Sequence, residues 1–179
     1  MLDTITAARA LFGLSIGFHI IFAVIGVGLP LFLLIIELLA SRTGDEMYKQ
    51  MAVRWARIFA MLFALGAVTG TIMSLELGLL FPGWMEFSGS IIGFIFTVEG
   101  VAFFIEAIFL GLYVYGRGRI FPGAHWILTI PLFVGSLASV ILIISINGWM
   151  NQPSGFEVSG GQAVNIDHLA VIFNKAMPH

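Results

Sequence analysis

The sequence predicts an all-α, polytopic membrane protein whose core is a bundle of four transmembrane helices. Hydrophobic residues make up 59% of the 179 residues and charged residues only 10%, whereas a soluble domain carries about 25% charged residues. The mean hydropathy is +1.04. Four apolar stretches reach the roughly 20 residues needed to cross the hydrocarbon of a bilayer. Lipid is therefore the expected solvent for most of this chain.

The apolar stretches define the predicted elements in order. The first covers residues 11–39 and is too long for the core of a cleaved signal peptide, about 7–15 residues, so it is expected to remain as a helix that Pro30 kinks. The others cover residues 57–81, 91–115 and 125–147, which makes residues 1–150 the predicted bundle. Residues 151–179 are expected to form an extracytoplasmic loop that leads to a fifth helix, of which this chain holds at most the start.

Charge predicts the orientation of the bundle. Six of the eight Lys and Arg residues lie in or next to the connections after the first and third stretches: Arg42, Lys49, Arg54, Arg57, Arg117 and Arg119. Cytoplasmic loops of membrane proteins are rich in Lys and Arg, so the N-terminus and residues 151–179 are expected outside. The formal net charge of −2 offers no basic face for nucleic acid. The chain has no cysteine, which excludes disulfides and thiolate-bound metal centres within it.

Five ionisable side chains fall inside the predicted spans: His19, Glu37, Glu76, Glu99 and Glu106. An ionisable group in lipid costs a few kcal/mol, so each is a candidate for function. At about 1.5 Å per residue, His19, Glu76 and Glu99 are expected in the outer half of the membrane. Glu37 and Glu76 lie near span ends, where a long side chain can reach the interface. For Glu37 we favour this placement at the interface over a functional role, whereas for Glu76 both stay open.

The third and fourth spans carry a candidate proton path. Glu106 follows Glu99 by seven residues, two helical turns, so both lie on one face of their helix. Two carboxyls stacked in this way can accept and pass on protons. Ser136, Ser139 and Asn147 lie within about one stripe of the fourth span, where they are expected to order water toward the carboxyls.

His19 is the only imidazole well inside the spans, and imidazole is a common axial ligand of haem iron. A single ligand leaves the other axial position open, as oxygen chemistry requires, or supplied from elsewhere. Two alternatives stay open: a proton- or ion-coupled transporter that uses the same carboxyls without haem, and a structural membrane subunit. In both, a hydrogen bond to a neighbouring helix accounts for His19.

Five segments carry a family resemblance: Leu11-Phe12-Gly13 to His19, Thr69-Gly70-Thr71, Leu75-Glu76-Leu77-Gly78, Val98-Glu99-Gly100 through Phe103-Phe104-Ile105-Glu106, and Asn147-Gly148-Trp149-Met150. Together they resemble the N-terminal portion of subunit I of the cytochrome bd-type quinol oxidases. The likeness covers essentially the whole chain in order.

The resemblance implies a multi-pass subunit in the inner (plasma) membrane of a bacterium or archaeon. The complete enzyme would oxidise quinol and reduce oxygen to water, with electrogenic proton uptake and with haem b and haem d as cofactors. Its implied partners are a second large subunit, small subunits, lipid, quinol and oxygen. The ligands of the low-spin haem belong to later parts of the family's chain, so neither His168 nor His179 is assigned, and this chain alone is not expected to be active.

The resemblance also implies roles for single residues. His19 is the axial ligand of one high-spin haem, either the second haem b or the haem d. Glu99 lies beside these haems, and Arg9 matches a basic residue of the same cofactor region. The implied proton path consists of Glu106, Ser139 and Asn147.

Overall fold

The computed structural model describes residues 3–120 and 123–175. Its long helices are α1 (Thr4–Thr43), α2 (Glu46–Leu80), α3 (Pro82–Tyr115) and α4 (Thr129–Asn151), the last preceded by the 3-10 helix η1 (His125–Leu128). All four helical segments are long and apolar enough to cross a membrane. The predicted all-α bundle is confirmed, and each predicted span coincides with one of these segments, although the span 57–81 runs one residue past the end of α2.

Capping residues define the first two helices. Asp3 begins α1, accepting a hydrogen bond of 2.6 Å from the backbone N–H of Thr6, and the hydrogen bonds of Thr6 lower the pKa of Asp3 below its usual value. Gly44 ends α1 with a φ of 71°, a left-handed conformation that favours glycine. Asp45 then begins α2 by accepting a hydrogen bond of 2.8 Å from the N–H of Met47. Gly44 and Asp45 therefore form the whole connection between α1 and α2.

The connection between α2 and α3 is the single residue Phe81. Pro82 is the first residue of α3, a position that suits proline because the N–H it lacks would have no partner inside the helix. The Phe81 ring meets the ring of Phe12 edge to face, with centroids 5.6 Å apart. This contact packs α1 against the connection between α2 and α3.

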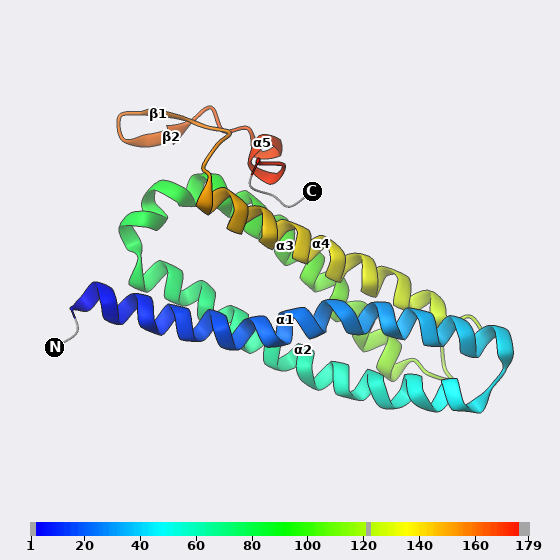
Figure 1. Ribbon diagram of the computed structural model, residues 1–179. Helices are drawn as coiled ribbons and strands as arrows, with labels where there is room; N and C mark the ends of the chain where they lie inside the picture. The colour runs from blue at the N-terminus through cyan, green and yellow to red at the C-terminus, as the bar shows by residue number, and fades with distance from the viewer. Residues whose placement is uncertain (1–2, 121–122, 176–179) are drawn as a thin grey trace.

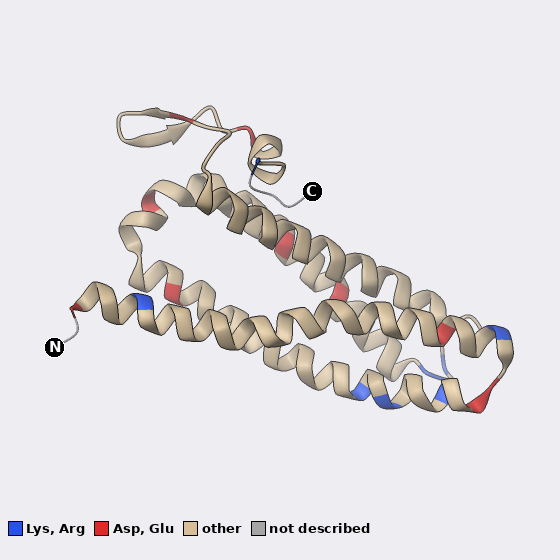
Figure 2. Ribbon diagram, in the orientation of Figure 1, with Lys and Arg blue, Asp and Glu red and all other residues tan. Residues whose placement is uncertain are grey.

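The four helices form two antiparallel pairs, α1–α2 and α3–α4, which lie close together at one end of the molecule and diverge toward the other (Figure 1). The close end carries the α1–α2 and α3–α4 connections and most of the Lys and Arg residues, so we call it the cationic end (Figure 2). We call the opposite end, where the N-terminus lies, the N-terminal end.

The two cores follow this arrangement. In the cationic half, one core joins all four long helices: Leu29, Leu33, Ile36, Ala52, Ala56, Phe59, Leu110, Tyr113, Leu128 and Leu132. At the N-terminal end, a second core joins α3 and α4 to the segment that follows them: Ile91, Ile92, Ile95, Leu142, Ile146, Trp149 and Val171.

The α1–α2 pair contributes buried residues only on its cationic side. Buried residues of α1 begin at Leu29 and those of α2 end at Phe59. Just beyond Phe59, the rings of Phe63 and Phe103 stack between α2 and α3 with centroids 4.9 Å apart. Residues 4–28 and 60–80 contain no buried residue, so the chain leaves the N-terminal half of this pair largely uncovered.

The segment after α4 contains more structure than a plain loop. The strands β1 (Glu157–Ser159) and β2 (Gln162–Val164) form an antiparallel hairpin, and the short helix α5 (His168–Ile172) follows. Gly160 and Gly161 make the hairpin turn with φ of 60° and 80°. The expected start of a fifth membrane helix stays a prediction, because residues 176–179, His179 among them, lie outside the described residues.

Helices α3 and α4 pack closely at Gly135. A Cβ added there would lie 3.1 Å from the carbonyl oxygen of Ala102 and 3.3 Å from the backbone nitrogen of Glu106. Small residues allow this close approach of membrane helices. Gly135 therefore helps to set the position of Glu106 against α4.

Replacing Gly135 with Leu is expected to separate α3 from α4 and to lower the free energy of unfolding by about 1–3 kcal/mol, the usual cost of overpacking. The measurement is the thermal unfolding midpoint of the purified protein. The matched control is Gly93→Leu on α3, because a Cβ at Gly93 meets nothing within 4 Å. Equal midpoints for the two variants would contradict this account of the helix contact.

Candidate functional site

His19 lies against α2 in the uncovered half of the α1–α2 pair. Its Nδ1 is 2.8 Å from the hydroxyl oxygen of Thr69, which is itself 2.9 Å from the carbonyl oxygen of Leu65. If the Thr69 hydroxyl donates its single hydrogen to Leu65, it accepts one from His19 Nδ1–H. This arrangement favours the tautomer in which Nε2 carries the lone pair, the form that binds a metal.

The absence of a side chain at Gly70 makes room for this imidazole. A Cβ at Gly70 would lie 3.1 Å from His19 Cε1, so the ring rests on the helix backbone. Within the described residues, Nε2 makes no hydrogen bond. The imidazole is thus held on one side and available on the other. From the sequence, Thr69 was known only as part of a segment that carries the family resemblance, and its contact with His19 was not predicted.

A second polar contact joins α1 and α2 one turn nearer the N-terminal end. The Ser15 hydroxyl donates a hydrogen bond of 2.8 Å to Glu76 Oε1. Glu76 Oε2 is buried without a hydrogen-bond partner among the described residues. Ser15 was not among the predicted site residues. Its spacing of four residues from His19 places both on one face of α1 and could have pointed to it.

The two carboxyls of the other pair lie between α3 and α4. The Ser139 hydroxyl donates a hydrogen bond of 2.9 Å to Glu99 Oε1. Glu106 is only 5% exposed, and Glu99 is near enough to influence its charge. The structure therefore brings together three of the residues that the sequence placed on a proton path.

Two predicted site residues are more peripheral. Asn147 is exposed on α4, and its backbone carbonyl accepts a hydrogen bond of 2.8 Å from Asn151 Nδ2. Arg9 is exposed on α1 and lies near enough to Asp3 to affect its charge. The roles of Arg9 and Asn147 stay predictions.

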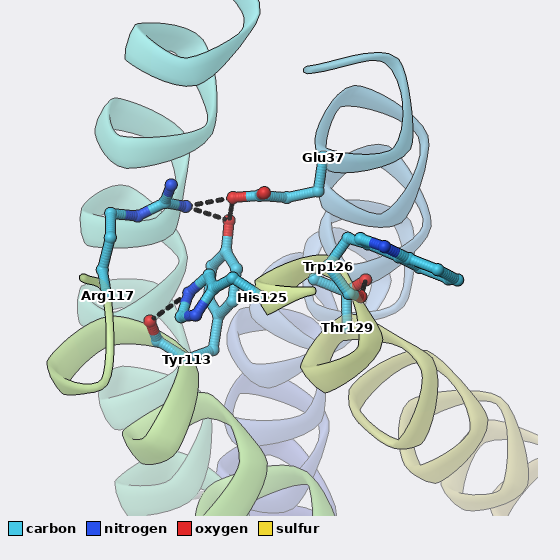
Figure 3. Close-up of polar contacts among 6 residues, drawn as sticks. All are labelled: Glu37, Tyr113, Arg117, His125, Trp126 and Thr129. Atoms are coloured by element: carbon cyan, nitrogen blue, oxygen red, sulfur yellow. Dashed lines mark hydrogen bonds and ion pairs between the residues drawn. The ribbon is translucent and has the colours of Figure 1, made fainter. Parts of the chain in front are cut away.

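A further polar group, which we call the Glu37 cluster, lies at the cationic end: Glu37, Tyr113, Arg117 and His125 (Figure 3). Tyr113 Oη donates to Glu37 Oε1 at 2.7 Å, and Arg117 Nη2 donates to Glu37 Oε1 and, at 2.9 Å, to Tyr113 Oη. The His125 ring stacks on the Tyr113 ring with centroids 4.9 Å apart.

The interface interpretation led us to expect an exposed Glu37, whereas the structure buries it against partners. Its side chain is 7% exposed and has an ion-pair partner, Arg117, in place. A signal in the sequence pointed to this cluster, because Tyr113 extends the seven-residue series of Glu99 and Glu106 along one face of α3. Tyrosine was overlooked because it carries no charge at neutral pH.

An imidazole and a pair of carboxyls inside apolar helices are rare, and they mark a candidate functional site of a membrane protein. Residues 7–179 match the sequence pattern of the cytochrome bd terminal oxidase subunit I family. The chain belongs to this family.

Individual relatives agree with the family match. The chain is 40% identical to a putative cytochrome bd menaquinol oxidase subunit I of Bacillus subtilis (strain 168), over 98% of this chain and 40% of the relative. It is 33% identical to the cytochrome bd-II ubiquinol oxidase subunit 1 of Escherichia coli (strain K12), over 97% of this chain and 34% of the relative.

A solved structure supports the same conclusion. The bd oxidase of Geobacillus thermodenitrificans matches with a TM-score of 0.94 and 43% identity, over 98% of this chain and 41% of the matched chain. The chain thus spans well under half the length of the relatives it matches.

The Ser139–Glu99 hydrogen bond can be measured by a double-mutant cycle. Combining Ser139→Ala with Glu99→Met, which removes the acceptor, is expected to give a coupling energy of about 0.6–1.5 kcal/mol, the range for hydrogen bonds between membrane helices. The measurement is the free energy of unfolding of each variant. The matched control is Ser136→Ala, because the Ser136 hydroxyl donates to the carbonyl of Phe133 on its own helix. Coupling of equal size in both cycles would contradict the assignment.

Proposed function

We propose that this chain is the haem-binding N-terminal portion of a respiratory terminal oxidase subunit, whose complete enzyme oxidises quinol and reduces oxygen to water. The observation that carries the proposal is the oriented His19, with Nε2 available, in a chain of the cytochrome bd oxidase subunit I family. The names of the relatives, menaquinol and ubiquinol oxidases, support quinol as the electron donor. This combination favours an oxidase over the transporter and the structural subunit that the sequence left open.

The residues of the chain fit a haem. A haem brings its own ring of nitrogen ligands, so a single imidazole is enough to hold the iron from one side. Thr69 fixes the orientation of His19, as partners of metal-binding histidines commonly do. When bound, haem b and haem d would supply the iron that accepts electrons and binds oxygen. Glu99 and Arg9 are the proposed neighbours of the cofactors.

The carboxyls of α3 are the proposed proton carriers. Reduction of oxygen to water consumes one proton for each electron, and a proton taken up near the haems compensates each added electron. Glu106, buried against α4, would pass a proton toward Glu99, whose Oε1 is held by the Ser139 hydroxyl. Asn147 is proposed to extend this path by ordering water.

The proposed orientation places the cationic end in the cytoplasm and the N-terminal end outside, in a bacterial or archaeal inner membrane. Electrogenic proton uptake would then run from the cytoplasm. The proposed partners are a second large subunit, small subunits and the remaining part of subunit I that the longer relatives contain. With lipid, they would cover the exposed apolar residues of α2: Leu65, Val68, Ile72, Leu75 and Leu79. The chain alone is not expected to be active.

Replacing His19 with Ala in the complete subunit is expected to abolish one high-spin haem signal, because His19 is the residue that would hold its iron. The absorption spectrum of the purified complex measures this loss. His168→Ala is the matched control, because His168 stacks on Phe94 outside the proposed site. Unchanged haem content and oxygen uptake in the His19 variant would count decisively against the proposal.

Replacing Glu106 with Gln keeps the size of the side chain but removes its ability to bind and release a proton. Oxygen uptake is expected to fall roughly 100-fold or more, the usual loss when a proton-transferring group is removed, with haem content retained. Glu86→Gln, at an exposed position on α3, is the control and should retain full uptake. A Glu106 variant as fast as this control would remove Glu106 from the path.

A further inference from the structure

The Glu37 cluster takes no part in the proposed chemistry, although it joins polar groups from three separate segments and buries two of them, Glu37 and Tyr113. We propose that it positions the site: by fastening α1 to the end of α3, it sets the angle between the two helix pairs and therefore the spacing between His19 and the Glu99–Glu106 pair. This inference rests on the proposed function only where haem is used as the readout.

The first support is that the cluster joins the two pairs. Glu37 belongs to α1, Tyr113 to α3, and Arg117 to the connection between α3 and α4, where His125 begins η1 (Figure 3). The hydrogen bonds of the Glu37 carboxylate therefore cross from one pair to the other. In contrast, the polar contacts of the candidate site stay inside a pair: Ser15–Glu76, His19–Thr69 and Glu99–Ser139.

The second support is the burial of the cluster. Tyr113 is fully buried and Glu37 is 5% exposed. Separating α1 from α3 would leave a buried carboxylate without its cation and its hydroxyl donor, which is strongly unfavourable. The contact is also directional, because one carboxylate oxygen accepts both donors. An apolar contact would allow the helices to slide, whereas this one fixes their register.

The third support is that apolar packing separates the cluster from Glu106. Leu110 lies between Glu106 and Tyr113 on α3 and is buried, as is Leu132 of α4, and both belong to the core of the cationic half. This packing favours a mechanical role for the cluster over an extension of the proton path.

Geometry makes the angle important for the site. His19 lies 18 residues from Glu37 and Glu99 lies 14 residues from Tyr113, or about 27 Å and about 21 Å along their helices. A change of about 5° at the cluster would move His19 by roughly 2 Å, which is more than a functional site tolerates. At the other end, Phe81 joins α2 directly to α3, so the cluster and this connection together hold both ends of the diverging pairs.

The test measures the distance between the two helix pairs, which changes with their angle, in the assembled complex reconstituted in nanodiscs. This chain has no cysteine, so labelling requires only that cysteines elsewhere in the complex be removed. Spin labels are attached at Ala10→Cys on α1 and Ser90→Cys on α3, two exposed positions. Pulsed EPR then reports the separation of α1 from α3. Glu37→Gln is expected to shift or broaden this distance by about 2 Å or more, and Tyr113→Phe by less. Arg117→Lys, which keeps the charge, should largely preserve it.

The control is Glu46→Gln, which removes the exposed Lys49–Glu46 ion pair at the same end and should leave the distance unchanged. The shift in Glu37→Gln should accompany altered absorption and carbon monoxide binding of the high-spin haems, with the low-spin haem signal retained. An unchanged distance in a complex that merely assembles in lower yield would overturn the proposal, as would a shifted distance with unaltered high-spin haems.

The two readouts separate this inference from the proposed function. If the unaltered complex carried no haem, the proposed function would fail, whereas the EPR distances would still decide whether the cluster sets the angle.

Discussion

Lipid offers no hydrogen bonds, so a partner in another helix stabilises an ionisable side chain between the ends of this bundle. Small hydroxyl residues meet much of this need. Ser15, Thr69 and Ser139 each contact one ionisable side chain across a helix pair. A hydroxyl suits the task because it can accept a hydrogen bond while it donates another. Glu37 is different, since a full cation and a phenol partner it.

This requirement divides the molecule into a closed half and an uncovered half. All four long helices share a core where the Glu37 cluster lies, whereas α1 and α2 contribute no buried residue toward the N-terminal end. His19 lies on the uncovered pair, whereas Glu99 lies near the middle of α3 and Glu106 is buried between Glu99 and the core of the cationic half. The candidate site therefore extends from the uncovered half toward the closed half.

The sequence was enough to locate the four helices, because length and hydropathy decide which segments cross a bilayer. It also placed Glu99 and Glu106 on one face, because helical periodicity relates residues within a span. It failed where rotation and partner choice decide the outcome. Glu37 was assigned to the interface because nothing in its own helix reveals Arg117, which is 80 residues away. The β1–β2 hairpin was missed because its strands are only three residues long.

The connection at Phe81 bears on how the chain enters the membrane during synthesis. A single residue separates α2 from α3, and Glu86 is the only charged residue between the two apolar spans. Little polar surface has to be carried across the lipid, so the two helices are suited to enter together as a preformed helical hairpin. Insertion of either one is thereby tied to insertion of the other, and a translocation defect in one span would withhold both from the membrane.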